Sequence, residues 1–223
     1  MPRYTRGFDV DAAHAHLARD RRLAAWMKRV GAIEADPRWR KPFDPVDALA
    51  RAILYQQLSG KAAATIVGRV EAAIGSTRLH FDTLGRIDDA ALRACGVSGN
   101  KSLALRDLAA REARGEIPTL RAMSVMAPDE IIDALVPIRG IGRWTVEMML
   151  MFRLGRADIL PVDDLGIRKG VQRVLKLEDM PTPKALPELC RRWSPYRTYA
   201  SLYLWRIADF AEQKTVATKR SQD

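Results

Sequence analysis

Two adjacent carboxylates, Asp163 and Asp164, stand directly before a segment whose apolar residues recur at helical spacing, Leu165–Leu175. An aspartate at this place is suited to cap the helix by accepting its first backbone N–H groups. A carboxylate held in this way is also suited to stabilise positive charge that develops on a bound substrate. The pair is therefore a candidate helix cap and a candidate catalytic group, and the two interpretations are compatible.

A glycine-containing turn, Ile138–Gly142, lies about twenty residues before this pair and joins two amphipathic segments. Glycines permit a tight reversal at positive φ and leave the backbone bare. Bare N–H groups beside a helix N-terminus form a phosphate site. We therefore predict a grip on a nucleic-acid backbone by Gly140 and Gly142, with Arg139 and Arg143 beside them. A plain connection between two helices is the alternative.

The composition indicates a folded protein with a polyanionic partner. The chain has 223 residues, of which 48% are hydrophobic, and 37 Lys and Arg against 27 Asp and Glu give a net charge of +10. Such an excess usually means nucleic acid, although a basic protein without this partner is the alternative. No segment approaches the roughly 20 apolar residues of a membrane helix, and the charged start, 1–22, predicts no signal peptide.

Metal and disulfide chemistry is disfavoured by the few ligand residues. Cys95 and Cys190 are far apart and form no C-x-x-C pair, so we expect neither a disulfide framework nor a zinc site. An Fe–S cluster held by cysteine alone needs four ligands, so we expect none. The histidines, His14, His16 and His80, form no plausible metal set, and we expect them on the surface or in helices.

The periodicity is helical nearly everywhere, and alternating strand patterns are absent. Pro128 followed by two acids suits a first helical turn. We predict an all-α protein of about ten helices. The segments that carry the pattern are 46–53, 63–74, 101–114, 128–136, 143–154, 165–175 and 196–212.

Four ordered motifs resemble the helix-hairpin-helix DNA glycosylases, specifically the 3-methyladenine DNA glycosylase II branch. They are ILYQQLSGKAA (53–63), VPIRGIGRWT (136–145), PVDDLGIRKG (161–170) and RWSPYRTYASLYLWRIAD (192–209). The resemblance covers residues from about 49 to 205. Several motifs in matching order and spacing are far more specific than any one of them.

The resemblance implies a single catalytic unit over 1–223, built as a two-lobed helical bundle with the active site in a cleft between the lobes. It places one lobe at 43–155, with the helix-hairpin-helix motif at 131–154. The other lobe would comprise 1–42 and 156–223.

The resemblance also implies the reaction, which is hydrolysis of the N-glycosidic bond of a damaged base flipped from duplex DNA. By family spacing Asp164 is the catalytic residue and Asp163 caps or supports it, with the reverse assignment as the alternative. The implied substrates are alkylated bases such as 3-methyladenine and 7-methylguanine, and further ethenoadenine or hypoxanthine. Product release would start base excision repair.

The resemblance assigns further roles around the flipped base. Gln57, followed by Leu58, would be the wedge that fills the gap in the duplex, with a polar helix–helix turn as the alternative interpretation. Trp144 and Trp205 match pocket tryptophans, although Trp205 in its apolar surroundings also suits a core. The remaining pocket positions are Tyr55 and two that depart from the tyrosines typical of the family, Met148 and Leu165.

Relatives that also nick the backbone carry a lysine where this chain has Trp144, so we predict a monofunctional glycosylase without AP lyase activity. The implied cofactor is at most a monovalent cation, Na⁺ or K⁺, held by the main-chain carbonyls of Val136, Ile138 and Ile141. We expect a monomer that binds double-stranded DNA, no membrane, and a cytoplasmic protein associated with the nucleoid if its source is bacterial.

Three other functions stay open at this stage. A non-catalytic helix-hairpin-helix protein would bind DNA without any reaction. A glycosylase for another lesion, such as a deaminated or mismatched base, would share every motif above. A bifunctional lyase would need a lysine other than the one that Trp144 replaces.

Overall fold

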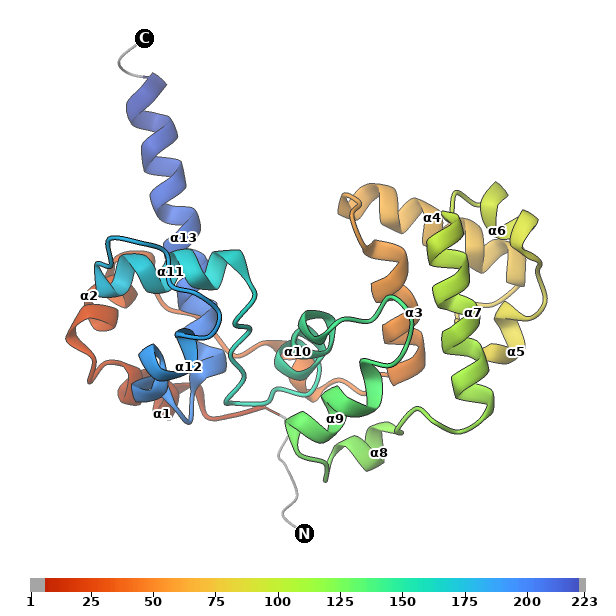
Figure 1. Ribbon diagram of the computed structural model, residues 1–223, viewed down its shortest axis with the longest axis horizontal. Helices are drawn as coiled ribbons and strands as arrows, with labels where there is room; N and C mark the ends of the chain where they lie inside the picture. The colour runs from red at the N-terminus through yellow and green to blue at the C-terminus, as the bar shows by residue number, and fades with distance from the viewer. Residues whose placement is uncertain (1–6, 221–223) are drawn as a thin grey trace. The chain divides into compact units, whose positions relative to one another are not determined.

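The computed structural model describes residues 7–220, without the side chains of Arg40 and of 211–220. Within that range it contains thirteen α-helices, two short 3-10 helices and no strand (Figure 1). The predicted all-α class is confirmed. The helices beyond the expected ten include one-turn elements, α5 (Phe81–Leu84), α8 (Leu120–Met123) and α12 (Leu186–Leu189). These are too short for a periodicity that needs a window of roughly 11 residues or more.

The chain divides into two compact units. Among the described residues, unit 1 comprises 42–146, and unit 2 comprises 7–41 and 147–220. The change of unit falls inside α10 (Arg143–Phe152), between Val146 and Glu147. The lobe boundary implied by the resemblance, after residue 155, lies later in the chain than this change of unit.

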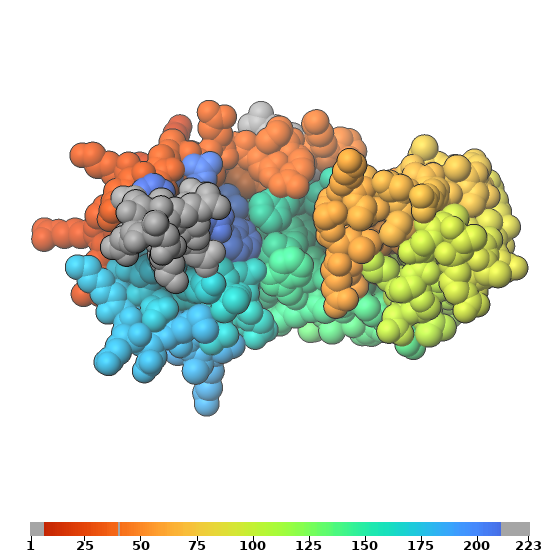
Figure 2. Space-filling view, turned by 90° about the horizontal axis from the view of Figure 1, so that it is seen from above, coloured from red at the N-terminus to blue at the C-terminus, as the bar shows by residue number. Residues whose placement is uncertain are grey.

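Unit 1 packs its helices around α7 (Gly99–Ala113), which buries Leu105 and Leu108. Its other helices are α3 (Pro45–Tyr55), α4 (Gly60–Ile74), α5, α6 (Asp89–Ala94), α8, α9 (Pro128–Leu135) and the first residues of α10. Figure 1 and the space-filling view in Figure 2 both show α4, α6 and α7 gathered at one end of this unit. The predicted helices at 46–53, 63–74 and 101–114 are found with ends shifted by a few residues.

His80 departs from the expectation that the histidines lie on the surface or in helices. It is the N-cap residue of α5 and is 5% exposed. Its ring lies between two carboxylates, with Nδ1 2.5 Å from Glu112 Oε1 and Nε2 3.2 Å from Asp44 Oδ2. A buried polar ring needs such partners, so His80 joins the start of α5 to α7 and to the cap of α3.

Unit 2 is built around α13 (Arg197–Arg220), whose first half buries Tyr199, Tyr203 and Leu204. The core also contains Trp193 and residues of α1 (Val10–Leu17), α2 (Arg21–Val30) and α11 (Leu165–Leu175). Its short elements are η1 (Pro37–Arg40), α12 and η2 (Arg191–Trp193). No helix in 7–220 is both long enough and apolar enough to cross a lipid bilayer.

Two contacts fix the position of α11. One is a close approach that requires glycine, and the other is an ion pair in the segment before the helix. A Cβ on Gly170 would lie 2.5 Å from the Leu204 carbonyl oxygen, so only glycine lets α11 lie directly against α13. The segment that leads to α11 is anchored by Asp158, which accepts hydrogen bonds from Arg197 Nε at 2.7 Å and Ser194 Oγ at 2.9 Å. Burial would raise the pKa of Asp158, but these hydrogen bonds outweigh it and hold the pKa below its usual value.

Candidate active site

Asp164 is the N-cap residue of α11, with an extended backbone (φ −72°, ψ 122°). Its Oδ1 accepts the backbone N–H of Ile167 at 2.9 Å and the indole N–H of Trp205 at 2.8 Å. Asp163 is exposed in the turn before it. The interpretation of this pair as a helix cap is therefore correct for Asp164 and wrong for Asp163, whose supporting or alternative catalytic role stays a prediction. Two donors from different helices hold the Asp164 carboxylate in one orientation.

Gly166 makes the contact between Asp164 and Trp205 possible. A Cβ at this position would lie 2.7 Å from Trp205 Cδ1 and 3.2 Å from Asp164 Oδ1. Carbon atoms do not approach so closely, and the indole is not the end of a flexible chain that could turn aside. Sequence reasoning missed this role. The only signal was a glycine in the first turn of a helix, where its low helix propensity is a cost.

Trp205 is half-buried and packs against the core of unit 2, as one of its two interpretations from sequence expected, and its indole N–H donates to Asp164. Its role in a base pocket stays a prediction. Its ring also stacks on Phe152, with ring centroids 6.0 Å apart and an interplanar angle of 20°. Sequence reasoning missed Phe152. The spacing of four residues from Trp144 to Met148 and from Met148 to Phe152 in α10 was a signal that could have found it.

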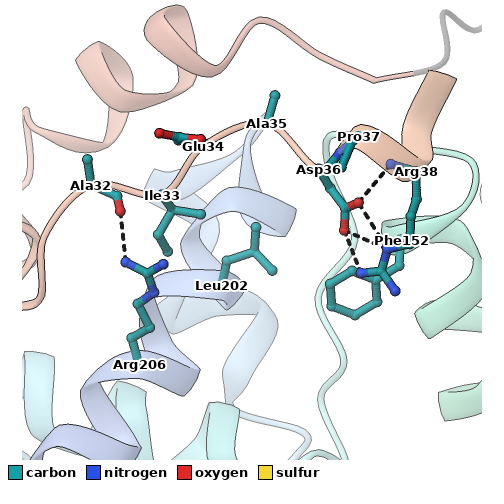
Figure 3. A pocket seen from close by; sticks show the side chains of 10 residues that line it. All are labelled: Ala32, Ile33, Glu34, Ala35, Asp36, Pro37, Arg38, Phe152, Leu202 and Arg206. Atoms are coloured by element: carbon teal, nitrogen blue, oxygen red, sulfur yellow. Dashed lines mark hydrogen bonds and ion pairs between the residues drawn. The ribbon is translucent and has the colours of Figure 1, made fainter.

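Phe152 also lines a surface depression of about 690 Å³ in unit 2, shown in Figure 3. Ile33, Leu202 and Phe152 give it apolar walls. Arg206 Nη1 donates to the Ala32 carbonyl at 2.8 Å across one end. At the other end Arg38, paired with Asp36, lies over the Phe152 ring, 4.9 Å from its centroid. One aromatic ring thus contacts both the indole bound to Asp164 and a pocket with mixed apolar and charged walls.

The predicted wedge loop of unit 1 is a type II turn between α3 and α4. Gln56 has φ −53° and ψ 134°, Gln57 has φ +57°, and Leu58 N donates to the Tyr55 carbonyl at 3.3 Å. The third residue of such a turn needs positive φ and is usually glycine or asparagine. Gln57 therefore holds a strained backbone in an exposed position, and strain of this kind concentrates at functional sites. Tyr55 and Leu58 on either side are also exposed, by 42% and 39%.

Two side chains brace this loop. Lys101 Nζ, at the start of α7, donates to the carbonyls of Leu54 and Gln56 at 2.7 and 2.8 Å. Gln56 Nε2 donates to the Gly140 carbonyl at 2.7 Å, which ties the loop directly to the glycine turn. The structure thus brings together the predicted wedge and the predicted phosphate grip. Sequence reasoning missed Lys101 and Gln56 because their partners lie 45 or more residues away.

The glycine turn joins α9 to α10, as the predicted helix-hairpin-helix motif requires. Gly140 has φ +79°, whereas Gly142 has no positive φ, so the expectation that both glycines serve the reversal is wrong for Gly142. A Cβ on Gly142 would meet nothing within 4 Å, which leaves its backbone bare. Buried Ile138 and Ile141 pack the turn onto the unit, and Arg139 N donates to Asp107 Oδ2 at 2.8 Å.

The remaining predicted residues lie in α10 and at the start of α11. Trp144 is 49% exposed in the first turn of α10, next to Arg143, whose Nη2 lies 3.3 Å from Asp129 Oδ1. These residues belong to unit 1. Met148 is partly buried in α10, and Leu165 is 51% exposed as the first residue of α11. Both belong to unit 2 with Asp164 and Trp205.

The three carbonyls assigned to a cation belong to the same turn. Val136 is the C-cap residue of α9, and the Ile138 carbonyl accepts the Ile141 N–H at 3.0 Å. A carbonyl oxygen has a second lone pair that this bond leaves available. The donor set of main-chain oxygens fits a hard monovalent cation, which prefers oxygen ligands. In the described residues no group of three or more His, Cys, Asp and Glu side chains forms a metal site.

Comparison with known proteins assigns this chain to a family. Residues 50–195 match the HhH-GPD superfamily of base excision DNA repair proteins. The chain is 38% identical over 172 residues to DNA-3-methyladenine glycosylase 1 of Schizosaccharomyces pombe, covering 76% of this chain and 75% of that protein. It is 33% identical over 166 residues to a putative DNA-3-methyladenine glycosylase of Bacillus subtilis, covering 72% of this chain and 58% of that protein.

Two solved structures have the same fold. One is the S. pombe 3-methyladenine DNA glycosylase in complex with abasic DNA, with a TM-score of 0.74, 35% identity, and coverage of 87% of this chain and 95% of the other. The other is a DNA-3-methyladenine glycosidase from Bacillus halodurans, with a TM-score of 0.79, 34% identity, and 95% coverage of both chains. The chain belongs to the HhH-GPD superfamily of base excision DNA repair proteins.

Proposed function

We propose that this protein is a DNA-3-methyladenine glycosylase of type II that hydrolyses the N-glycosidic bond of alkylated bases in duplex DNA. The observation that carries the proposal is the Asp164 carboxylate, held by the N–H groups of Ile167 and Trp205 at the start of α11. The similarity to glycosylases that act on 3-methyladenine supports this substrate class. 7-Methylguanine, ethenoadenine and hypoxanthine are the further bases that we propose.

The chemistry asks little more than a fixed negative charge. As the bond between C1′ and the base nitrogen breaks, its electron pair leaves with the base and positive charge develops on the deoxyribose. Asp164 stabilises this charge. The oxygen of a water molecule then bonds to C1′, and its proton passes to Asp164 or to solvent. A purine alkylated at N3 or N7 is cationic and departs as a neutral base, so no acid is needed to protonate 3-methyladenine or 7-methylguanine.

The base itself must be extruded from the duplex before the reaction. We propose that it is received by an aromatic pocket, because an electron-poor ring stacks well on indole and phenyl faces. Within unit 2 the proposed pocket residues are Trp205, Met148 and Leu165, which the sequence predicts, joined by Phe152 through its stacking on Trp205. Trp144 and Tyr55 belong to unit 1, and their contact with the base stays a prediction from the family resemblance.

We propose that unit 1 holds the DNA. The bare backbone at Gly140 and Gly142 would bind a phosphate, with Arg139 and Arg143 adding positive charge. A monovalent cation held by the carbonyls of Val136, Ile138 and Ile141 would add positive charge at the same turn. Since one chain supplies the grip, the wedge and the carboxylate, we propose that it acts as a monomer.

The proposal is tested by incubating the protein with duplexes that each contain one lesion: 3-methyladenine, 7-methylguanine, ethenoadenine, hypoxanthine or uracil. We expect free 3-methyladenine and 7-methylguanine, detected by chromatography, and strand breaks only after alkali treatment. Release of uracil alone would identify a glycosylase for a deaminated base. Tight DNA binding with no base released from any duplex would identify a non-catalytic DNA-binding protein.

Gln57→Gly is expected to remove the wedge and leave its turn intact. Glycine adopts the positive φ of this position more readily than glutamine, so the variant should be as stable as the wild type or slightly more stable. Without a side chain to fill the gap, extrusion of the base becomes less favourable. We expect the single-turnover rate of base release to fall roughly tenfold, since unstacking costs a few kcal/mol.

Gln57→Asn is the matched control, because asparagine also tolerates positive φ and keeps an amide. It should retain more activity than Gln57→Gly at equal thermal stability. Equal, wild-type rates for both variants would show that Gln57 is only a turn residue.

A separate prediction is that the protein has no AP lyase activity. With Trp144 at the position where bifunctional relatives carry a lysine, no Schiff base with the sugar is expected. Incubation with abasic or lesion-containing DNA in the presence of sodium borohydride should give no covalent protein–DNA adduct on a denaturing gel. An adduct would show that another lysine acts as a nucleophile and that the protein is a lyase as well.

A further inference from the structure

Unit 2 carries a depression lined almost entirely by basic side chains, at the junction of α1, α2 and η2. We name it the arginine pocket; its volume is about 540 Å³ and its lining residues are His16, Arg19, Asp20, Arg21, Arg22 and Arg192. We propose that the arginine pocket is a second binding site for phosphate groups of the DNA backbone, separate from the glycine turn of unit 1. This inference rests on the proposed function in so far as it requires that the protein binds DNA.

The single acid in the pocket does not neutralise the arginines facing solvent, because it is engaged in the fold. Asp20 Oδ1 caps α2 by accepting the N–H groups of Arg22 and Leu23 at 2.9 and 3.2 Å. Asp20 Oδ2 accepts the indole N–H of Trp193 at 3.1 Å, and the Asp20 side chain is only 9% exposed. Arg192 approaches this oxygen at 3.8 Å but stays 58% exposed. Positive charge therefore dominates the accessible surface of the pocket.

The position of two of these arginines is unfavourable for the free protein. Arg21 and Arg22 are the first two residues of α2, whose first turn contains no acid. Positive charge near a helix N-terminus is repelled by the helix dipole, and the Asp20 carboxylate at the N-cap offsets this repulsion only in part. Arg22 offsets part of this cost by donating to the Leu175 carbonyl at 2.9 Å. An anion bound in the pocket would be attracted both by these arginines and by the positive end of the helix dipole.

The contact of Arg22 with Leu175 also locates the pocket relative to Asp164 within unit 2. Leu175 is the last residue of α11 and Asp164 caps its first turn. At 1.5 Å per residue the two ends of α11 are about 16 Å apart. The arginine pocket is therefore distinct from the carboxylate site, at a distance comparable with the axial rise of about five base pairs.

The chemistry of the lining fits an oxyanion, and phosphate is the oxyanion that a DNA partner supplies. Guanidinium groups bind phosphate oxygens through paired N–H donors, and this geometry favours arginine over lysine at such sites. Four arginines from two elements, α2 and η2, and from the segment before α2 converge on one depression. A backbone phosphodiester meets this requirement without any base contact, so the site would add affinity that is independent of DNA sequence.

The test is the salt dependence of binding to an undamaged duplex, measured by fluorescence anisotropy for the wild type and for Arg19→Gln/Arg21→Gln. Both side chains are exposed, so their replacement should leave the fold unchanged. The slope of log K against log salt is negative, and each lost phosphate contact lowers its magnitude by about 0.9. We expect the magnitude of the slope to fall by about 1.8, and the affinity near 0.1 M salt to fall roughly 60-fold if the two lines meet near 1 M salt.

The matched control is Lys28→Gln/Lys184→Gln, which removes the same charge from exposed positions of unit 2 outside the pocket. Its slope should stay near that of the wild type. An equal loss of slope in both double variants would show a general charge effect and overturn the inference, as would no loss in either. A second arm measures the thermal stabilisation by inorganic pyrophosphate. If only this stabilisation is lost in Arg19→Gln/Arg21→Gln, the pocket binds a free anion and the DNA assignment is wrong.

Failure of this inference and failure of the proposed function are distinguishable. Undamaged DNA has no base to release, so the slope reports binding alone. A protein that releases 3-methyladenine but shows the same slope in all variants refutes only the arginine pocket. If the wild type releases no base but Arg19→Gln/Arg21→Gln has a weaker salt dependence of DNA binding, only the glycosylase proposal is refuted.

Discussion

Asp164→Asn is expected to lower the single-turnover rate of 3-methyladenine release by at least a hundredfold. The amide is neutral and no longer stabilises positive charge on the deoxyribose, and removal of one such group typically costs 10²–10³ in rate. Asparagine caps helices as well as aspartate does. Its oxygen can still accept the N–H groups of Ile167 and Trp205. The variant should therefore keep its thermal stability and its affinity for abasic DNA.

Asp163→Asn is the matched control, because it removes the same charge from the neighbouring, exposed residue. It should release base at nearly the wild-type rate. Loss of activity in Asp163→Asn with full activity in Asp164→Asn would reverse the assignment. Full activity in both variants would remove this carboxylate pair from the reaction altogether.

Gly166→Ala should reduce base release by about a hundredfold although it lies outside the reacting groups. The added methyl would stand 2.7 Å from Trp205 Cδ1 and 3.2 Å from Asp164 Oδ1, so the indole and the carboxylate must move apart. A misplacement of about 1 Å in a catalytic group can cost 10²-fold in rate. Overpacking of this kind also costs roughly 1–3 kcal/mol of stability. Circular dichroism melts and single-turnover assays measure the two effects.

Gly68→Ala is the control for the helix itself. Gly68 lies exposed within α4, and a Cβ there would meet nothing within 4 Å. The change should raise stability by up to about 1 kcal/mol through helix propensity, with activity unchanged. If Gly166→Ala behaves in the same way, then Trp205 does not need its close approach to Asp164.

The elements of this fold could be predicted because their signals are local. The cap at Asp164, the proline at the start of α9 and the glycine at the reversal between α9 and α10 each act within a few residues. The helix over 165–175 was predicted with the observed ends, because a capping acid precedes it and its apolar positions are regular. Helices of one turn escaped prediction because a single turn contains too few apolar positions to form a pattern.

The side chains that hold the candidate site in place could not be predicted, because their partners are distant in sequence. Trp205 is 41 residues from Asp164, and Lys101 is 45 residues from Gln56. Neither composition nor periodicity indicates such pairs. The glycine at position 166 is likewise explained only by the Trp205 indole that packs against it. Local patterns and the family resemblance predict the candidate residues, and tertiary contacts decide how their side chains are oriented.

The bracing of the type II turn has a consequence for how this protein can diversify. The hydrogen bonds of Lys101 and of the Gln56 side chain fix the main chain of the α3–α4 loop. The side chain at position 57 therefore contributes little to the conformation of this loop. Mutations at position 57 can therefore replace the proposed wedge side chain without changing the conformation of the loop. Asparagine, glycine and histidine, which accept a left-handed backbone, are the substitutions open to such evolution.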